Sequence, residues 1–183
     1  FHYTQHPEMA DWQPVLGRKV GIIGMGNVML DIVHYLKQQK APREVTAIAR
    51  RGPTEVKFDK QTLEPVASCL DLPNIRAAVD EAIPQTKKIG EDVEDFYDLL
   101  AQARKNAEEC DSGIDFGMKF LRSPRRILGD DQGRVKEVVF EINELVREGD
   151  RIKSVGTGQL ETVTLDTVIF SIGSHVDERF GLP

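Results

Sequence analysis

The chain has 183 residues, of which 24 are Lys or Arg and 30 are Asp or Glu, so its formal net charge is −6. This negative balance argues against a general binder of nucleic acid or of anionic membranes. Hydrophobic residues make up 40% of the chain, as in an ordinary folded domain rather than a disordered one. No apolar run approaches the ~20 residues of a membrane span, and no signal peptide is visible.

The two cysteines, Cys69 and Cys110, lie far apart in the sequence and form no CxxC pair. This spacing speaks against a disulfide framework and against a zinc site. We therefore expect a reducing, cytoplasmic compartment and no bound metal.

The first part of the chain predicts a βαβ unit. After an irregular leading segment at 1–17, residues 19–24 form a short apolar run that ends in glycine, which is typical of a buried parallel strand. Apolar residues then recur with helical spacing in 27–38, and 44–49 has the composition of a second strand. A strand, a tight glycine turn, a helix and a strand in this order are typical of a dinucleotide-binding unit.

The middle of the chain predicts helices around a third strand. Residues 59–70 are expected to be helical with a break at Pro65, because proline costs ~3 kcal/mol inside a helix. Residues 74–79 are expected to be a third parallel strand, and 92–110 are the clearest long helix. The apolar face of that helix would consist of Val93, Phe96, Leu100, Ala103 and Ala107.

From Met118 the apolar period changes to two, which indicates strands. Apolar and polar residues alternate in parts of 135–145. We expect a polar turn at 146–158 and strands at 159–164 and 167–172. The sequence thus predicts an α/β fold: a Rossmann-like parallel sheet with helices plus an antiparallel β-meander, the three-layer FAD/NAD(P)-binding type.

Two glycines lie between the first predicted strand and helix, as a dinucleotide-binding turn requires. Gly24 would permit a sharp turn, and Gly26 would let the backbone approach a pyrophosphate without an intervening Cβ. The N–H groups around Asn27 and Val28 would then point at the phosphates, at the positive end of the helix dipole. Met29 occupies the third small-residue position, so the fingerprint is incomplete. The alternative is a turn that only joins strand to helix.

An arginine pair, Arg50 and Arg51, directly follows the second predicted strand. NAD-specific folds place an acid here, against the ribose 2′-hydroxyl. Guanidinium groups instead match the charge and shape of a 2′-phosphate. The pair therefore favours NADP(H) over NAD(H); the alternative is a solvated basic loop. A second basic cluster, Arg122, Arg125 and Arg126, is expected to be a solvated edge; the alternative is a docking site for an acidic electron carrier.

At these motifs the chain resembles a known family, the ferredoxin–NADP reductases of the adrenodoxin reductase type. The motifs occur in family order and span most of the chain. The related reductase subunits of glutamate synthase usually carry other residues after the arginine pair. The matching residues are Gly24–Val28 with Asp31, Arg50–Pro53 with Phe58, Phe120–Pro124 and Ser171–Gly173, together with the terminal stretches Tyr3–Pro7 and Gly181–Pro183.

The resemblance implies a protein with two dinucleotide-binding domains, in which an NADP domain is inserted into an FAD domain. Residues 18–173 would form the NADP(H)-binding domain, and 1–17 and 174–183 would connect it to an FAD domain outside this sequence. In such proteins NADPH passes a hydride to FAD, which then passes electrons to a ferredoxin-like iron–sulfur protein. The isolated chain would bind NADPH but not turn over.

By position, the resemblance places the pyrophosphate at the glycine turn and the 2′-phosphate at the arginine pair. Thr62 departs from the pattern, because family members often carry a glutamate there, near the adenosine ribose. Glu64 lies close by. No catalytic residue and no metal ligand is assigned. The candidate cofactor-binding residues are Gly24, Gly26, Asn27, Val28, Arg50 and Arg51.

Three other functions compete with this interpretation. A nucleotide-sensing Rossmann module would bind the dinucleotide without chemistry, but such modules usually continue βαβ units rather than a meander. An ordinary two-domain dehydrogenase would need an acid or base residue that the sequence does not reveal. The pyridine-nucleotide domain of a glutamate synthase small-subunit-like reductase would share the fold.

Overall fold

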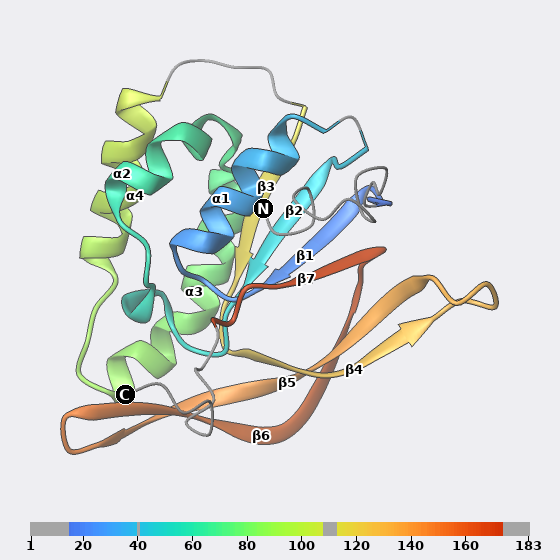
Figure 1. The fold of residues 1–183 in the computed structure, drawn as a ribbon. Coiled ribbons are helices and arrows are strands. Elements are labelled where there is room, and N and C mark those ends of the chain that lie inside the picture. Colours follow the sequence, from blue (N-terminus) through green and yellow to red (C-terminus); the bar gives the residue numbers. More distant parts are fainter. Residues whose placement is uncertain (1–14, 40, 108–112, 174–183) are drawn as a thin grey trace, which may run out of the picture.

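A computed structural model describes residues 15–39, 41–107 and 113–173 (Figure 1). The connecting segments expected at 1–17 and 174–183 therefore lie outside the described residues, apart from Val15, Leu16 and Gly17. Cys110 also lies outside them. Within the described part, no helix is both long enough and apolar enough to cross a membrane.

Four parallel strands form the central sheet in the order β3-β2-β1-β7. Their last residues stand side by side, because Ile23 pairs with both Ile48 and Phe170, and Ile48 pairs with Lys119. The carboxyl ends of all four strands therefore form one edge of the sheet. The strands are β1 (Lys19–Ile23), β2 (Glu44–Ile48), β3 (Asp115–Lys119) and β7 (Thr167–Phe170).

Helices cover one face of this sheet (Figure 1). The break expected at Pro65 is confirmed, since α2 ends at Leu63 and a 3-10 helix follows. Of the apolar face predicted for the long helix at 92–110, Phe96, Leu100 and Ala103 are buried in α4. Val93 is buried just before this helix, and Ala107 is half-buried just after it. The helices are α1 (Asn27–Lys37), η3 (Pro53–Glu55), α2 (Lys60–Leu63), η4 (Glu64–Cys69), α3 (Leu72–Lys88) and α4 (Glu94–Asn106).

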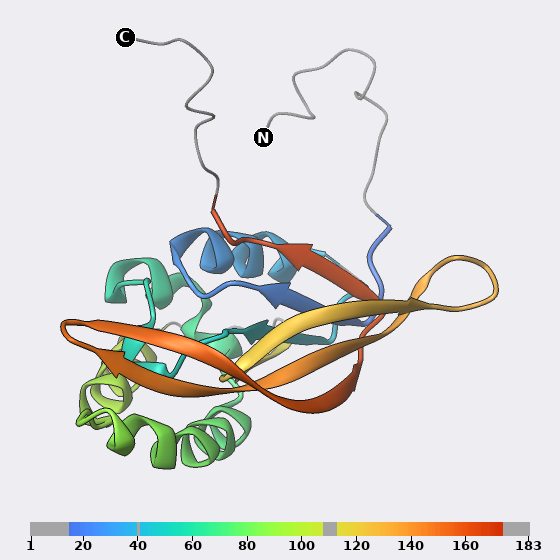
Figure 2. The same cartoon turned by 90° about the horizontal axis from the view of Figure 1, so that it is seen from below.

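An antiparallel meander covers the other face of the sheet. It consists of β4 (Arg122–Gly129), β5 (Val135–Glu148) and β6 (Arg151–Thr164). Figure 2 shows the long β5–β6 hairpin twisting across the sheet and reaching the helical layer. Val138 and Phe140 of β5 pack on the sheet. The predicted three-layer α/β fold is confirmed.

The prediction of a strand at 74–79 is wrong, because this stretch lies inside α3. The side chain of Asp71 caps the helix by accepting a hydrogen bond from the Asn74 N–H at 3.1 Å. The buried residues Ile75, Val79 and Ala82 then follow helical spacing. The third parallel strand of the sheet is β3, which includes Met118, where the meander was expected to begin.

The polar turn expected at 146–158 is also wrong. Strands β5 and β6 continue through this region, and only Gly149 and Asp150 separate them. Burial alternates only at the two ends of β6, and the middle of the strand is exposed throughout, so the pattern of a half-buried strand is interrupted there. A Cβ at Gly156 would lie 2.4 Å from the Glu141 carboxylate, so this glycine accommodates a side chain that crosses the strand.

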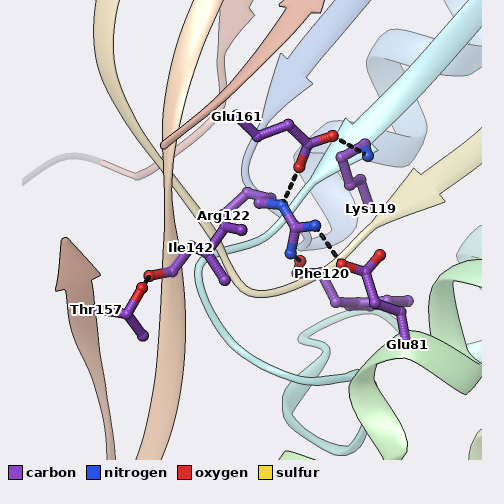
Figure 3. A network of polar contacts seen from close by, with 7 residues as sticks. All are labelled: Glu81, Lys119, Phe120, Arg122, Ile142, Thr157 and Glu161. Carbon is purple, nitrogen blue, oxygen red and sulfur yellow. Dashed lines mark hydrogen bonds and ion pairs between the residues drawn. The ribbon is translucent and has the colours of Figure 1, made fainter. Parts of the chain in front are cut away.

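Arg122 is 4% exposed, so the solvated edge expected for it is wrong. Figure 3 shows its guanidinium between a carboxylate of the same meander, from β6, and one of the helical layer, from α3. Its Nε donates to Glu161 of β6 at 2.5 Å, and its Nη2 pairs with Glu81 of α3. Lys119 of β3 donates to the same Glu161 carboxylate at 2.7 Å. This charge cluster joins the meander, the sheet and the helical layer. Arg126 is exposed, as expected.

Replacing Arg122 should destabilise the fold in a pH-dependent way. Burial opposes ionisation of Glu161, but hydrogen bonds from Lys119 and Arg122 outweigh it and hold the pKa of Glu161 below its usual 4.5. That contribution to stability is present above pH 4.5 and is lost as pH falls through the lowered pKa. Arg122→Met should therefore lower the free energy of unfolding by about 2–4 kcal/mol at neutral pH, and by less once the pH has fallen through the lowered pKa of Glu161.

Urea unfolding at several pH values measures this effect. The exposed Arg126→Met is the control and should change stability by less than about 0.5 kcal/mol. An Arg122→Met loss as small as that of the control, or one that does not shrink in acid, would contradict the role assigned to the cluster.

Candidate functional site

The carboxyl edge of the sheet brings the four sequence motifs together. Gly24 follows β1, and its N–H donates to the Ile48 carbonyl at the end of β2 at 2.9 Å. Ser171 follows β7, and its N–H donates to the Ile23 carbonyl at 2.8 Å. Leu121 follows β3, and its N–H donates to the Arg51 carbonyl at 3.2 Å. In open α/β sheets this edge is where ligands bind.

Gly24 is constrained by the strand beside it. Its φ is +125°, a conformation that residues with a side chain rarely adopt. A Cβ at this position would lie 2.4 Å from the Ser171 carbonyl oxygen. The glycine turn and the Ser171 motif therefore fit together only because residue 24 is glycine.

Gly26 is the N-cap of α1, in extended backbone with φ of −124°. Among the described residues, no side chain accepts a hydrogen bond from the first-turn N–H groups of this helix, and no acid lies in that turn. In contrast, the Asp59 carboxylate caps α2 by accepting from Thr62 N–H at 2.9 Å, and Asp71 caps α3. Helix α1 thus presents open N–H groups at the sheet edge, where an anion would be stabilised.

The Asn27 side chain has a different role from its backbone. Its Nδ2 donates to the Asp59 carboxylate at 3.1 Å, and its Oδ1 accepts from the Asp59 N–H at 3.2 Å. Hydrogen bonds from Thr62 and then Asn27 hold the pKa of Asp59 below its usual range. The Asn27 side chain therefore anchors the segment before α2. The Val28 side chain is exposed beside it.

The two arginines after β2 have different surroundings, which the sequence alone did not predict. Arg50 is exposed and makes no ion pair within the described part of the chain. Arg51 is half-buried, and its Nη1 lies 3.4 Å from Oε2 of Glu55. Burial raises the pKa of Glu55, with Arg51 partly opposing it. Arg51 therefore already has an acidic partner, whereas Arg50 faces solvent.

The meander fixes the backbone that carries Arg50. Asn143 of β5 is buried, and its Nδ2 donates to the Arg50 carbonyl and to Ser123 Oγ, each at 2.8 Å. The Arg122 N–H donates to the Ala49 carbonyl at 2.9 Å. The sequence motif Phe120–Pro124 thus supports, from the adjacent layer, the loop that carries Arg50 and Arg51, which we call the arginine loop. Sequence reasoning missed Asn143, and only its polar character within an apolar strand signals it.

Comparison with known proteins identifies relatives of the chain. A scan against models of protein families finds no match. The chain is 27% identical over 209 residues to the mitochondrial NADPH:adrenodoxin oxidoreductase of Salvelinus fontinalis, covering 93% of this chain and 40% of that protein. It is 24% identical over 204 residues to the Bos taurus protein of the same name, covering 93% and 41%.

The structure of Mycobacterium tuberculosis FprA in complex with NADPH agrees with these matches. It superposes with a TM-score of 0.70 at 25% identity, over 99% of this chain and 44% of FprA. The chain is homologous to part of the adrenodoxin reductases. It spans about two fifths of the length of the curated relatives that it matches. The resemblance inferred from the motifs is confirmed.

The two glycines should respond differently to the same substitution. Gly24→Ala should lower the free energy of unfolding by about 2–4 kcal/mol, because the new Cβ meets the Ser171 carbonyl at a positive φ. Gly26→Ala should change it by less than about 1 kcal/mol, because its Cβ would lie 3.7 Å from the Lys57 carbonyl oxygen, an ordinary contact. Chemical denaturation of both variants measures this difference. Equal losses would contradict the distinct geometries.

Asn143→Ala should loosen the arginine loop. The substitution leaves the Arg50 carbonyl without this donor, which should cost about 1–3 kcal/mol of stability. Ser123→Ala removes only the other acceptor of Asn143 and should cost less. Hydrogen exchange at the Arg51 and Leu121 amides would show the loosening. Unchanged exchange in Asn143→Ala would argue that Asn143 does not position the loop.

Proposed function

We propose that residues 18–173 form the NADP(H)-binding domain of a flavoprotein oxidoreductase. One observation carries the proposal: the open start of α1 and the solvent-facing Arg50 lie at the same edge of the sheet, after neighbouring strands. A dinucleotide with a 2′-phosphate has two anionic groups on one adenosine, and it requires these two features close together.

The chain would bind the pyrophosphate with backbone rather than with side chains. The N–H groups of Asn27 and Val28 would donate to it, and Gly26 would leave the space that a phosphate oxygen needs. The observed geometry fits this use, because a Cβ at Gly26 would meet only Lys57, and not closer than 3.7 Å. The Arg50 guanidinium would pair with the 2′-phosphate, and Arg51, already paired with Glu55, would contribute less.

The proposed reaction is the transfer of a hydride from NADPH to FAD, followed by electron transfer to a ferredoxin-like iron–sulfur protein. NADPH supplies the hydride when bound, and this chain holds and orients it. The flavin would be bound by an FAD domain of the same polypeptide, because hydride transfer requires the two rings in contact. Homology to proteins named NADPH:adrenodoxin oxidoreductase, and to FprA in complex with NADPH, supports this proposal.

Arg50→Ala tests the cofactor assignment. Loss of a charge-assisted hydrogen bond contributes about 1.5–3 kcal/mol, so NADP+ affinity should fall about 10- to 100-fold. NAD+ affinity should change less than about twofold, because NAD+ has no 2′-phosphate. Isothermal titration calorimetry on the 183-residue chain measures both. Arg126→Ala, an exposed arginine on the meander, is the matched control. Equal affinity of the unaltered chain for NADP+ and NAD+ would overturn the assignment.

A further inference from the structure

The segment 57–59 crosses the glycine turn and is hydrogen-bonded to residues 25–27 of that turn. The Lys57 N–H donates to the Met25 carbonyl at 2.9 Å, and Gly26 and Lys57 form a parallel bridge. Two residues on, Asp59 exchanges two hydrogen bonds with the Asn27 side chain. Lys57 is therefore fixed beside the glycine that the proposed site uses.

The side chain of Lys57 begins beside the space that Gly26 leaves open. A Cβ built on Gly26 would lie 3.8 Å from the Cβ of Lys57. A pyrophosphate that approached Gly26 on the side where glycine lacks a Cβ would pass next to the Lys57 side chain. The flexible four-carbon stem of lysine then lets its ammonium reach a phosphate oxygen.

The charge of Lys57 is also available. Lys57 is exposed and makes no ion pair in the part of the chain that the structure describes, and it favours the ionised form of Glu55 less than Arg51 does. Its cationic neighbours are paired: Arg51 with Glu55 at 3.4 Å, and Lys60 with Glu64 at 3.7 Å. The Asp59 carboxylate, held next to Asn27, places a negative charge near the start of α1. A cation at residue 57 would offset the repulsion between that carboxylate and a bound phosphate.

We propose that Lys57 is a pyrophosphate-binding residue whose ammonium pairs with the diphosphate of the bound dinucleotide, separately from Arg50 at the 2′-phosphate. This inference rests on the proposed function. It assigns the affinity for the diphosphate in part to a side chain, in addition to the backbone N–H groups of α1. Lys57 should therefore act on any dinucleotide, whereas Arg50 should act only on ligands that carry the 2′-phosphate.

Calorimetry with three ligands separates the two residues. Lys57→Met should weaken binding of NADP+ and NAD+ by the same factor, about tenfold. Its affinity for adenosine 2′-monophosphate, which lacks the diphosphate, should change by less than about twofold. Arg50→Ala should weaken the binding of NADP+ and of adenosine 2′-monophosphate, and it should leave the binding of NAD+ unchanged. Lys57→Arg should retain most of the affinity for NADP+.

Lys136→Met is the control for the loss of one positive charge. Lys136 is exposed, and its carbonyl accepts from Leu165 N–H, next to the start of β1 at the opposite edge of the sheet. Circular dichroism and melting temperature should be unchanged in both lysine variants, because neither side chain is buried.

The outcomes distinguish this inference from the proposed function. If the parent binds NADP+ and Lys57→Met binds it equally well, the role of Lys57 is overturned and the proposed function stands. The same conclusion follows if Lys57→Met weakens the binding of adenosine 2′-monophosphate as much as that of NADP+. If the parent binds none of the three ligands, both are overturned. Selective loss of the two dinucleotides in Lys57→Met, with Lys136→Met unchanged, supports the assignment.

Discussion

At Gly24 the chain leaves β1 with a φ of +125°, and the Ser171 carbonyl oxygen stands where a Cβ would be, 2.4 Å away. This close approach sets the direction in which α1 leaves the sheet. It also places the end of β7 against the turn, so two stretches separated by almost the whole chain share one constraint. The open N–H groups of α1 face the carboxyl edge of the sheet because of this turn, and every element of the proposed cofactor site is placed relative to it.

The antiparallel layer contributes to the site as well as to the core. Asn143 and Leu121 bind the carbonyls of Arg50 and Arg51, so the arginine loop is held from the meander side. The Arg122 charge cluster ties this same layer to the sheet and to α3 (Figure 3). A Rossmann unit without the meander would carry the same arginine pair on a loop with fewer backbone restraints. The meander therefore holds the backbone of Arg50 while its side chain is exposed to solvent.

The sequence predicted the fold class, the glycine turn and the first two strands because each depends on local patterns. It failed where a specific partner, near or far in the sequence, decides the structure. Residues 74–79 look extended locally, but the Asp71 cap and burial against the sheet make them helical. Arg122 looks like a surface cation, and only the carboxylates of Glu81 and Glu161 explain its burial. The unequal environments of Arg50 and Arg51 likewise depend on Glu55, four residues beyond Arg51.

Net charge alone would not suggest an anion site in this chain, which carries a formal charge of −6. The local balance differs, because Glu55 is paired with the cationic Arg51. Asp59 keeps its negative charge, since its partners Thr62 and Asn27 are neutral, but the cationic Lys57 stands two residues before it. Arg50 and the start of α1 face the same edge without such partners in the described structure. Coulomb interactions weaken with distance and are screened within about 10 Å at 0.1 M salt. The few groups at the sheet edge, rather than the surplus of acids elsewhere, therefore determine the potential that a phosphate would meet.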